Sequence, residues 1–221
     1  MNQALGAGLA VALVSLLAVA GPLVGISPAW IALLAALSLG ALSLDAASFG
    51  GRGGHLLAEA LPGGQARLRR IAIHEAGHVL VASEEAMPVG DVLVGSLACW
   101  RAGLDSNGST QLEPPAHAKL PEPELRRWSR VLQAGMAAEQ LIYGESVGGA
   151  DDRALLGRLW GLSGFDVAMA QREQRRARRE VDQLLRQRQA DLEAEAERLL
   201  EASPRLFSTP KLFSRRPLRE P

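Results

Sequence analysis

The N-terminal segment most constrains the fold, because residues 4–43 contain no charged side chain. The run Ala4–Ile26 is rich in leucine, valine and alanine, and it has about the length that a membrane span needs, roughly 20 residues. Gly-Pro and Ser-Pro pairs then interrupt the apolar sequence, and a second, slightly shorter run covers Ala29–Leu44. We therefore expect two transmembrane helices in residues 1–46, arranged as a tight hairpin.

Two other interpretations of this segment are less favoured. A cleaved signal peptide has a basic N-terminal region, which Met1-Asn2-Gln3 does not provide. A buried core hairpin is the other alternative.

The first basic residues follow the second apolar run, at Arg52, Arg67, Arg69 and Arg70. The positive-inside rule then predicts that residues 50–221 face the cytoplasm or its organellar equivalent.

Composition excludes several classes of function. The formal net charge is zero, which gives no general attraction to nucleic acid. Neither lysine, Lys119 or Lys211, follows a glycine, so the chain contains no Gly-Lys-Ser/Thr phosphate-binding loop. Cys99 is the single cysteine, which excludes an internal disulfide and a cysteine-based zinc cluster. We expect Cys99 to be a small apolar residue on a strand.

The remaining sequence predicts a mainly helical domain with a small strand region. Residues 47–66 are rich in glycine and are predicted to be a linker, and residues 203–221 a flexible tail. Between them, residues 67–202 are expected to form one domain. Spacing and turn residues predict helices over about 65–85, 123–143, 151–162 and 167–202, a strand over 89–100 and a loop over 101–123. The arginine-rich half of the last helix is predicted to be a solvated face, because acidic residues interleave.

The first of these helices contains the pattern His74-Glu75-Ala76-Gly77-His78. Residues four apart on a helix project from one face, so the two imidazoles could hold one zinc ion. Glu75 could accept a proton from a water on that ion, whose pKa zinc lowers to about 7. We expect Ala76 and Gly77 to keep the helix slim where substrate or a strand approaches.

A zinc site of this kind needs a third protein ligand. His55 lies in the glycine-rich linker and His117 in a proline-rich loop, so both are poor candidates. Glu139, Asp151 and Asp152 remain as acidic candidates from the helices that follow.

Three stretches together resemble the peptidase domain of the FtsH family of membrane-bound, ATP-dependent zinc metalloproteases. The first is the zinc motif. The second, residues 133–144, is similar to the family's Gly-Gly-Arg-Ala-Ala-Glu-Glu-Leu-Ile-Phe-Gly segment, and the third, Gly148-Gly149-Ala150-Asp151-Asp152, to its Thr-Gly-Ala-x-Asn-Asp segment. A late stretch around Glu180 and Asp191 also matches the family's C-terminal helix. The likeness covers roughly residues 66–202.

This resemblance implies a helical, zincin-like peptidase domain in which His74, His78 and Asp152 hold Zn²⁺ and Glu75 is the catalytic base. A one-residue gap in the alignment would make Asp151 the third ligand instead. In either alignment, the resemblance implies that Glu139 is a structural acid or one that supports a ligand. The family's ATPase domain has no counterpart here, which makes the chain similar to a stand-alone relative without an ATPase.

Three functions follow as hypotheses. The first is a membrane-anchored zinc endopeptidase that cleaves unfolded or membrane-associated proteins. The second is a catalytically silent FtsH-like partner or scaffold for a membrane protease complex. A homo-oligomer and association with an ATP-dependent protease both stay open as assemblies of this chain. The third, an intramembrane metalloprotease, is disfavoured because charged residues flank the zinc motif closely. The expected partners are protein or peptide substrates and the lipid bilayer, with no nucleic acid.

Overall fold

The computed structural model describes residues 12, 14–49, 52–115 and 117–204. The chain divides into two compact units, Met1–Gly54 and His55–Pro221. The predicted C-terminal tail lies almost entirely outside the described residues.

The first unit is dominated by helix α2, Pro28–Phe49, which follows a 3-10 helix, η1, Gly21–Val24. Its window Pro28–Asp45 is long and apolar enough to cross a membrane, and 0% of that window is buried inside the structure. Leucines and Trp30 are exposed along it. The predicted first span falls partly outside the described residues, and its described part includes only a shorter apolar helix, Val14–Leu23. The two-span hairpin therefore stays a prediction.

The predicted linker, residues 47–66, is largely helical, and the boundary between the two units falls within it. Helix α2 continues to Phe49, and helix α3 covers Arg52–Ala60. The carboxylate of Asp45 accepts hydrogen bonds from the amides of Gly53 and Gly54, at 2.8 and 2.9 Å. These amides belong to the first turn of α3, where backbone N–H groups have no partner within the helix. The two glycines therefore lie in the first turn of a helix.

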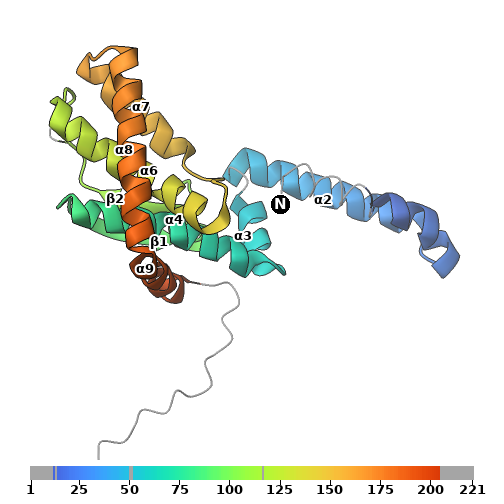
Figure 1. Ribbon diagram of the computed structural model, residues 1–221. Helices are drawn as coiled ribbons and strands as arrows, with labels where there is room; N and C mark the ends of the chain where they lie inside the picture. The colour runs from blue at the N-terminus through green and yellow to red at the C-terminus, as the bar shows by residue number, and fades with distance from the viewer. Residues whose placement is uncertain (1–11, 13, 50–51, 116, 205–221) are drawn as a thin grey trace, which may run out of the picture. The chain divides into compact units, whose positions relative to one another are not determined.

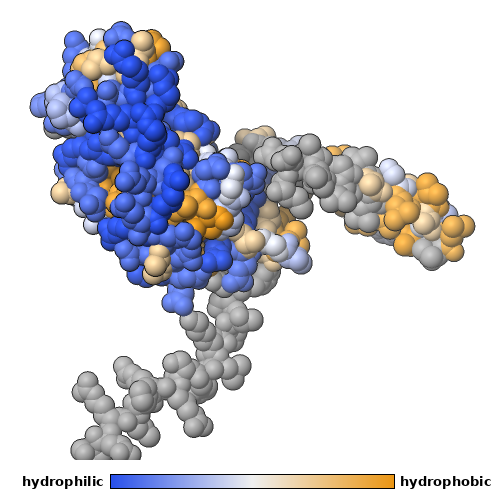
Figure 2. All heavy atoms as spheres, in the orientation of Figure 1, coloured by the Kyte–Doolittle hydropathy of each residue, from blue (hydrophilic) through white to orange (hydrophobic). Residues whose placement is uncertain are grey.

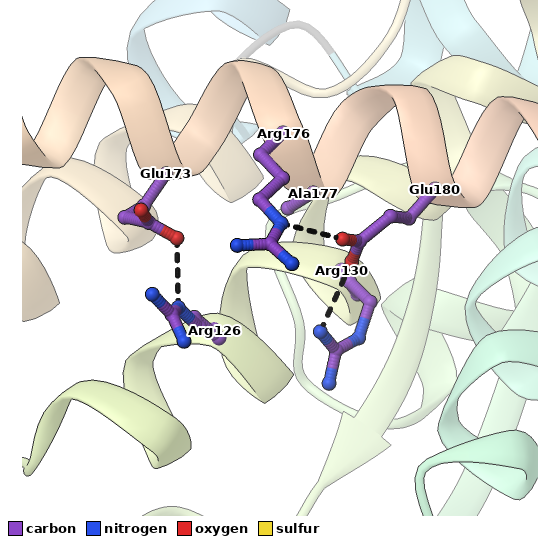
Figure 3. Close-up of a pocket in the computed structure, with 6 residues that line it drawn as sticks. All are labelled: Arg126, Arg130, Glu173, Arg176, Ala177 and Glu180. Atoms are coloured by element: carbon purple, nitrogen blue, oxygen red, sulfur yellow. Dashed lines mark hydrogen bonds and ion pairs between the residues drawn. The ribbon is translucent and has the colours of Figure 1, made fainter.

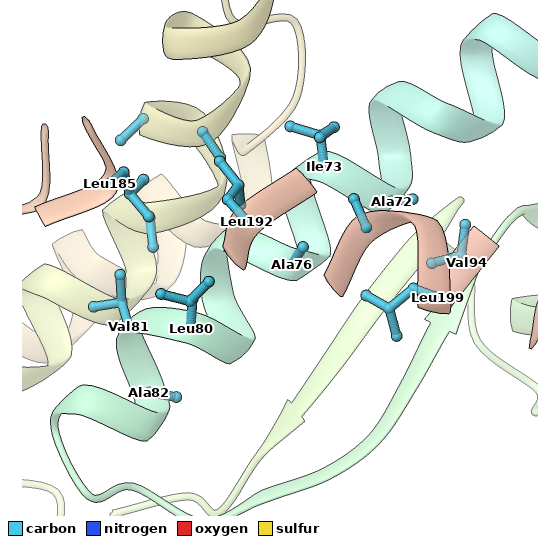
Figure 4. Close-up of a cluster of buried hydrophobic side chains, with 14 of the residues drawn as sticks. Ala72, Ile73, Ala76, Leu80, Val81, Ala82, Val94, Leu185, Leu192 and Leu199 are labelled. Atoms are coloured by element: carbon cyan, nitrogen blue, oxygen red, sulfur yellow. The ribbon is translucent and has the colours of Figure 1, made fainter. Parts of the chain in front are cut away.

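The second unit is built around two long helices, α4 (Gly64–Glu84) and α6 (Glu122–Tyr143). Helix α8 (Val167–Gln187) packs on α6, and α9 (Gln189–Ala202) packs on α4. Figure 1 shows α4, α6 and α8 side by side. The main core combines α4 with apolar side chains of α8, α9 and the first strand, as Figure 4 shows for Ile73, Val81, Leu185, Leu192 and Val94.

A second apolar cluster joins α6 to α7 (Ala150–Ser163) and α8. Trp128 and Trp160 are its largest members, and Leu125 is fully buried. The indole Nε1 of Trp160 donates to Ser129 Oγ at 2.9 Å, so the buried polar atom of the tryptophan has a partner. This cluster holds α7, whose first turn contributes to the site described below.

The segment predicted as one strand over 89–100 changes conformation at Gly95. Strand β1, Val89–Val94, is followed by helix α5, Ser96–Arg101. Gly95 has φ +93°, which favours glycine and ends the strand. The carboxylate of Glu59 accepts from Ser96 N at 2.9 Å and from Ser96 Oγ at 2.6 Å, which satisfies the first turn of α5. Cys99 is buried as expected, but it lies on this helix and not on a strand.

Two further expectations are corrected. The predicted loop 101–123 contains strand β2, Gly108–Leu112, which pairs antiparallel with β1. The last predicted helix, 167–202, is broken at Arg188, where φ −112° and ψ 29° leave the helical region. The break lets α9 turn onto α4 and bury Leu192, Ala196, Leu199 and Leu200.

The surface of α8 is strongly hydrophilic, as Figure 2 shows. A groove between α6 and α8 is lined by arginines and glutamates that pair with one another (Figure 3). Arg126 donates to Glu173 at 2.7 Å, and Glu180 accepts from Arg176 at 2.9 Å and from Arg130 at 3.2 Å. The pairs made by Arg126 and Arg130 join the two helices across the groove, while Arg176 pairs with Glu180 within α8.

Helices α4 and α6 approach closely because Gly77 has no side chain. A Cβ at residue 77 would lie 2.7 Å from the carbonyl oxygen of Ala134 and 2.8 Å from Ala138 Cβ. The slim surface expected around Gly77 is therefore real, but a helix approaches it, not a strand.

Gly77→Ala should lower the free energy of unfolding by about 2 kcal/mol, because backbone atoms must move apart to admit the methyl group. The matched control Gly157→Ala, on α7 with nothing within 4 Å of the added Cβ, should raise stability by about 0.5–1 kcal/mol. Thermal unfolding of the full chain in detergent micelles measures both. Equal midpoints for the two variants would contradict the close packing at Gly77.

Candidate metal centre

Helix α4 buries a polar group of side chains within the α4–α6 packing. His74, Glu75 and His78 are 9%, 5% and 4% exposed. One helical turn separates the two imidazoles, whose ring centroids lie 4.9 Å apart. The space that they occupy exists because residue 135 on α6 is glycine. A Cβ there would lie 2.3 Å from His74 Nε2 and 2.6 Å from His78 Nε2.

Hydrogen bonds fix the orientation of both imidazoles. His74 Nδ1 donates to Glu139 Oε1 at 2.7 Å, and His78 Nδ1 donates to the carbonyl oxygen of Val131 at 2.8 Å. An ionised Glu139 carboxylate and a backbone carbonyl can accept hydrogen bonds but cannot donate them. Each ring therefore keeps a proton on Nδ1. The Nε2 atoms are then available as ligands, an arrangement that is typical of metal-binding histidines.

Asp152 approaches both Nε2 atoms from the first turn of α7. Its Oδ2 lies 3.2 Å from His74 Nε2 and 3.5 Å from His78 Nε2. Ligands about 2.0–2.1 Å from a tetrahedral ion are separated by about 3.3 Å. The ligand atoms of the three residues all lie within 4.8 Å of one another. His74, His78 and Asp152 could therefore hold a metal ion.

A glycine turn places Asp152 in this position. Gly149, just before α7, has φ +83°, and a Cβ there would lie 2.4 Å from Met136 Cγ. Residue 149 therefore needs glycine both for its backbone conformation and for its contact with α6.

Glu139 supports His74 and is itself held firmly. It is 2% exposed, and its carboxylate accepts from the amides of Val147 and Gly148 at 2.9 and 3.2 Å. Arg70 Nε lies 3.6 Å from Glu139 Oε2. Burial alone would raise the pKa of Glu139, but the hydrogen bonds from His74 and from these amides outweigh it and lower the pKa. Glu139 is therefore an ionised acceptor for His74.

The charges around the imidazoles favour a cation at this place. Burial alone would lower the pKa of His74, but hydrogen bonds to Asp152 and Glu139 raise it to about 10. For Asp152, hydrogen bonds to His74 and His78 outweigh the effect of burial and lower its pKa. Without a metal ion, a proton on His74 supplies the positive charge that the carboxylates require. A metal ion that binds here takes the place of that proton.

Glu75 points toward strand β2. Its Oε2 accepts a hydrogen bond from Thr110 Oγ1 at 2.7 Å. Burial raises the pKa of Glu75, although the nearby imidazoles and the Thr110 hydrogen bond oppose the shift. A buried carboxylate with a raised pKa beside candidate metal ligands has the properties of a proton acceptor.

The structure thus brings His74, Glu75, His78 and Asp152 together, while their roles as ligands and base stay predictions. Asp151 is exposed and lies outside the group, and His55 accepts from Arg67 at 2.7 Å instead. His117 is exposed on a loop. Sequence reasoning missed Thr110 and Gly135. Thr110 lies in a segment that is predicted to be a loop. Gly135 lies within a helix, where the sequence does not indicate which side chains pack against a glycine.

No protein-family model matches this sequence. Among curated proteins, the chain is similar to the ATP-dependent zinc metalloprotease FtsH of Methylococcus capsulatus, with 37% identity over 89 residues. The match covers 39% of this chain but 13% of the FtsH chain. This partial similarity suggests a relationship to FtsH and is a hint of metalloprotease function.

Gly135→Ala should abolish tight metal binding without removing any ligand, because the new methyl group must displace both imidazoles from their present positions. We expect the helical circular dichroism to be retained, because the new methyl group meets the ends of the two imidazole side chains and no backbone atom has to move. Gly161→Ala, with open space at its Cβ, is the matched control. Zinc content after dialysis measures the effect. Wild-type zinc content in Gly135→Ala would contradict this geometry.

Proposed function

We propose that this chain is a membrane-anchored zinc metallopeptidase that hydrolyses peptide bonds of unfolded or membrane-associated proteins. One observation carries the proposal. Two imidazoles, each oriented through Nδ1, direct Nε2 toward the same oxygen of Asp152. Two nitrogen ligands and one carboxylate leave a fourth position for water or substrate, which is the composition of a catalytic zinc site.

Several further observations support a peptidase over other zinc enzymes. Glu75 lies beside the first histidine of the motif, where a metallopeptidase has its general base. The protein to which the chain is partly similar is named a zinc metalloprotease, which is the same class of activity. No Gly-Lys-Ser/Thr loop occurs in these residues, so we propose substrates that are already loose enough to enter the site.

The residues divide the chemistry among them. Zinc, when bound by His74, His78 and Asp152, would supply a Lewis acid that polarises the scissile carbonyl and lowers the pKa of water to about 7. Glu75 takes one proton from the attacking water as its oxygen bonds to the carbonyl carbon. Glu75 then gives that proton to the amide nitrogen as the C–N bond breaks. The second proton of the water also stays with the products, which leave as a carboxylate and an ammonium group, and Glu75 is returned to its starting state.

The membrane anchor is part of the proposal. Helix α2 exposes apolar side chains along a window that suits a membrane span, and aqueous exposure of so many leucines would be unfavourable. We place the peptidase unit on the cytoplasmic side or its organellar equivalent, because the arginines follow the apolar segment. The substrates nearest to such a site are membrane proteins and unfolded chains at the bilayer surface.

A catalytically silent partner of an ATP-dependent protease is the alternative function. Such a chain has no need of an oriented imidazole pair, a buried base and a matching carboxylate. Their presence together favours catalysis.

Glu75→Gln should lower the rate of cleavage of an unfolded protein such as reduced, alkylated casein by about 10²–10⁴-fold, because the general base is lost. Zinc content should remain that of the wild type, since the side chain at position 75 takes no part in binding the ion. Cleavage by the zinc-loaded full chain in detergent micelles is followed by mass spectrometry. Glu113→Gln, at an exposed site beyond β2, is the control. Cleavage at the wild-type rate by Glu75→Gln would refute the peptidase assignment.

A further inference from the structure

Strand β2 lies against α4 (Figure 1) and contacts Glu75 of that helix. Alternate residues of a strand face the same side, so Gly108, Thr110 and Leu112 share one face. Gly108 and Thr110 both meet the Glu75 carboxylate, one at each oxygen. Thr110 Oγ1 is 2.7 Å from Oε2, and a Cβ at residue 108 would lie 2.4 Å from Oε1.

These two contacts restrict the carboxylate in different ways. The hydroxyl of Thr110 donates to Oε2 and fixes the rotation of the carboxylate plane. Gly108 leaves the volume that Oε1 occupies, and a methyl group there would also lie 2.6 Å from Ile71 Cγ2. Among the described residues, no other hydrogen bond to the Glu75 carboxylate is found, so Oε1 has no hydrogen-bond donor of its own.

The backbone that presents Thr110 is itself held in place. Gly95 N donates to Asn107 O at 2.8 Å, and Ser96 Oγ lies 2.7 Å from Asn107 Oδ1. Glu59 accepts from Ser96, which ties α3 to this end of the hairpin. Thr110 is paired with Val92 of β1 in the ladder. The hydroxyl group of Thr110 is therefore held in a fixed position, from which it can orient Glu75.

We propose that Thr110 is a positioning residue for the general base. It holds Glu75 Oε2 by a hydrogen bond, so that Oε1 faces the reacting water in a single orientation. The inference rests on the proposed peptidase function. It assigns strand β2 a role in catalysis besides any role in binding substrate. Thr110 itself touches neither the metal ligands nor the proton that is transferred.

A purely structural role of Thr110 and a role in positioning Glu75 predict different experimental results. If Thr110 serves only to satisfy a buried carboxylate, its removal changes stability and leaves the turnover of folded protein unchanged. If it positions Glu75, turnover falls while zinc content and substrate affinity stay the same. The catalytic effect must also disappear when Glu75 can no longer act as a base.

The first experiment compares Thr110→Val, which has nearly the same shape without the hydroxyl, with Thr110→Ser, which keeps it. We expect kcat for a fluorogenic peptide to fall by about 10–100-fold in Thr110→Val, the range of a hydrogen bond to a charged group, with KM unchanged. Thr110→Ser should restore most of kcat. Ser109→Ala, on the opposite face of β2, is the matched control. Zinc content should be equal in all four proteins. Equal kcat values for Thr110→Val and Thr110→Ser would overturn the proposal.

The second experiment is a double-mutant cycle with Glu75→Gln. Thr110→Val should cause no further loss of residual activity in that background. An undiminished loss there would show that Thr110 acts by another route and would overturn the proposal.

The same contact is tested in metal-free full chain, with chelator present, by thermal unfolding. Thr110→Val should lower the midpoint by at least about 2 °C when Glu75 is present, and by less in the Glu75→Ala background. Equal shifts in the two backgrounds would mean that Thr110 does not hold Glu75. If the wild type cleaves nothing, the peptidase function fails, and this thermal cycle still decides whether the contact exists.

Discussion

The structure of the second unit depends on burying negative charge beside two imidazoles. Glu75, Glu139 and Asp152 approach His74 and His78 within a site whose residues are mostly buried. Burying carboxylates is unfavourable unless positive charge and hydrogen bonds compensate them. Of these three carboxylates, Arg70 lies near only that of Glu139, at 3.6 Å. A further positive charge, from a proton on His74 or from a metal ion, would therefore stabilise the site.

Small residues make room for this charged group between two packed helices. Gly77 lets α4 and α6 approach, and Gly135 leaves the volume that the imidazoles fill. Gly148 does the same for the carboxylate of Glu139, because a Cβ there would lie 2.7 Å from Oε1. The site is thus built from the shape of the α4–α6 contact as well as from its polar side chains. This explains why single methyl groups are expected to have large effects here.

Strand β2 completes the site from the other side of α4. Thr110 donates to one oxygen of the Glu75 carboxylate, and Gly108 leaves the space that the other oxygen occupies. The proposed ligands and the proposed base are therefore held by different neighbours. Helices α6 and α7 orient the imidazoles and Asp152, while the hairpin orients Glu75. A change in the hairpin can then affect turnover without affecting metal binding.

The helices and the centre of the site could be predicted from the sequence, because both follow from spacing along one helix. The pair His74 and His78 and the stripe that forms α6 are local patterns of this kind. The break at Arg188, the helix at Ser96 and strand β2 could not be predicted, since each depends on contacts between distant residues. Glu59 satisfies the first turn of α5 from 37 positions away. Thr110 was missed for the same reason, because nothing local links it to Glu75.

The choice between two adjacent aspartates tests the central claim most directly. Zinc affinity of the full chain is measured by competition with a fluorescent chelator for Asp152→Ala and for Asp151→Ala, which alters an exposed neighbour. The account predicts that Asp152→Ala loses tight zinc binding, while Asp151→Ala binds zinc as the wild type does. Tight binding by Asp152→Ala, or its loss in Asp151→Ala alone, would contradict a metal centre formed by His74, His78 and Asp152.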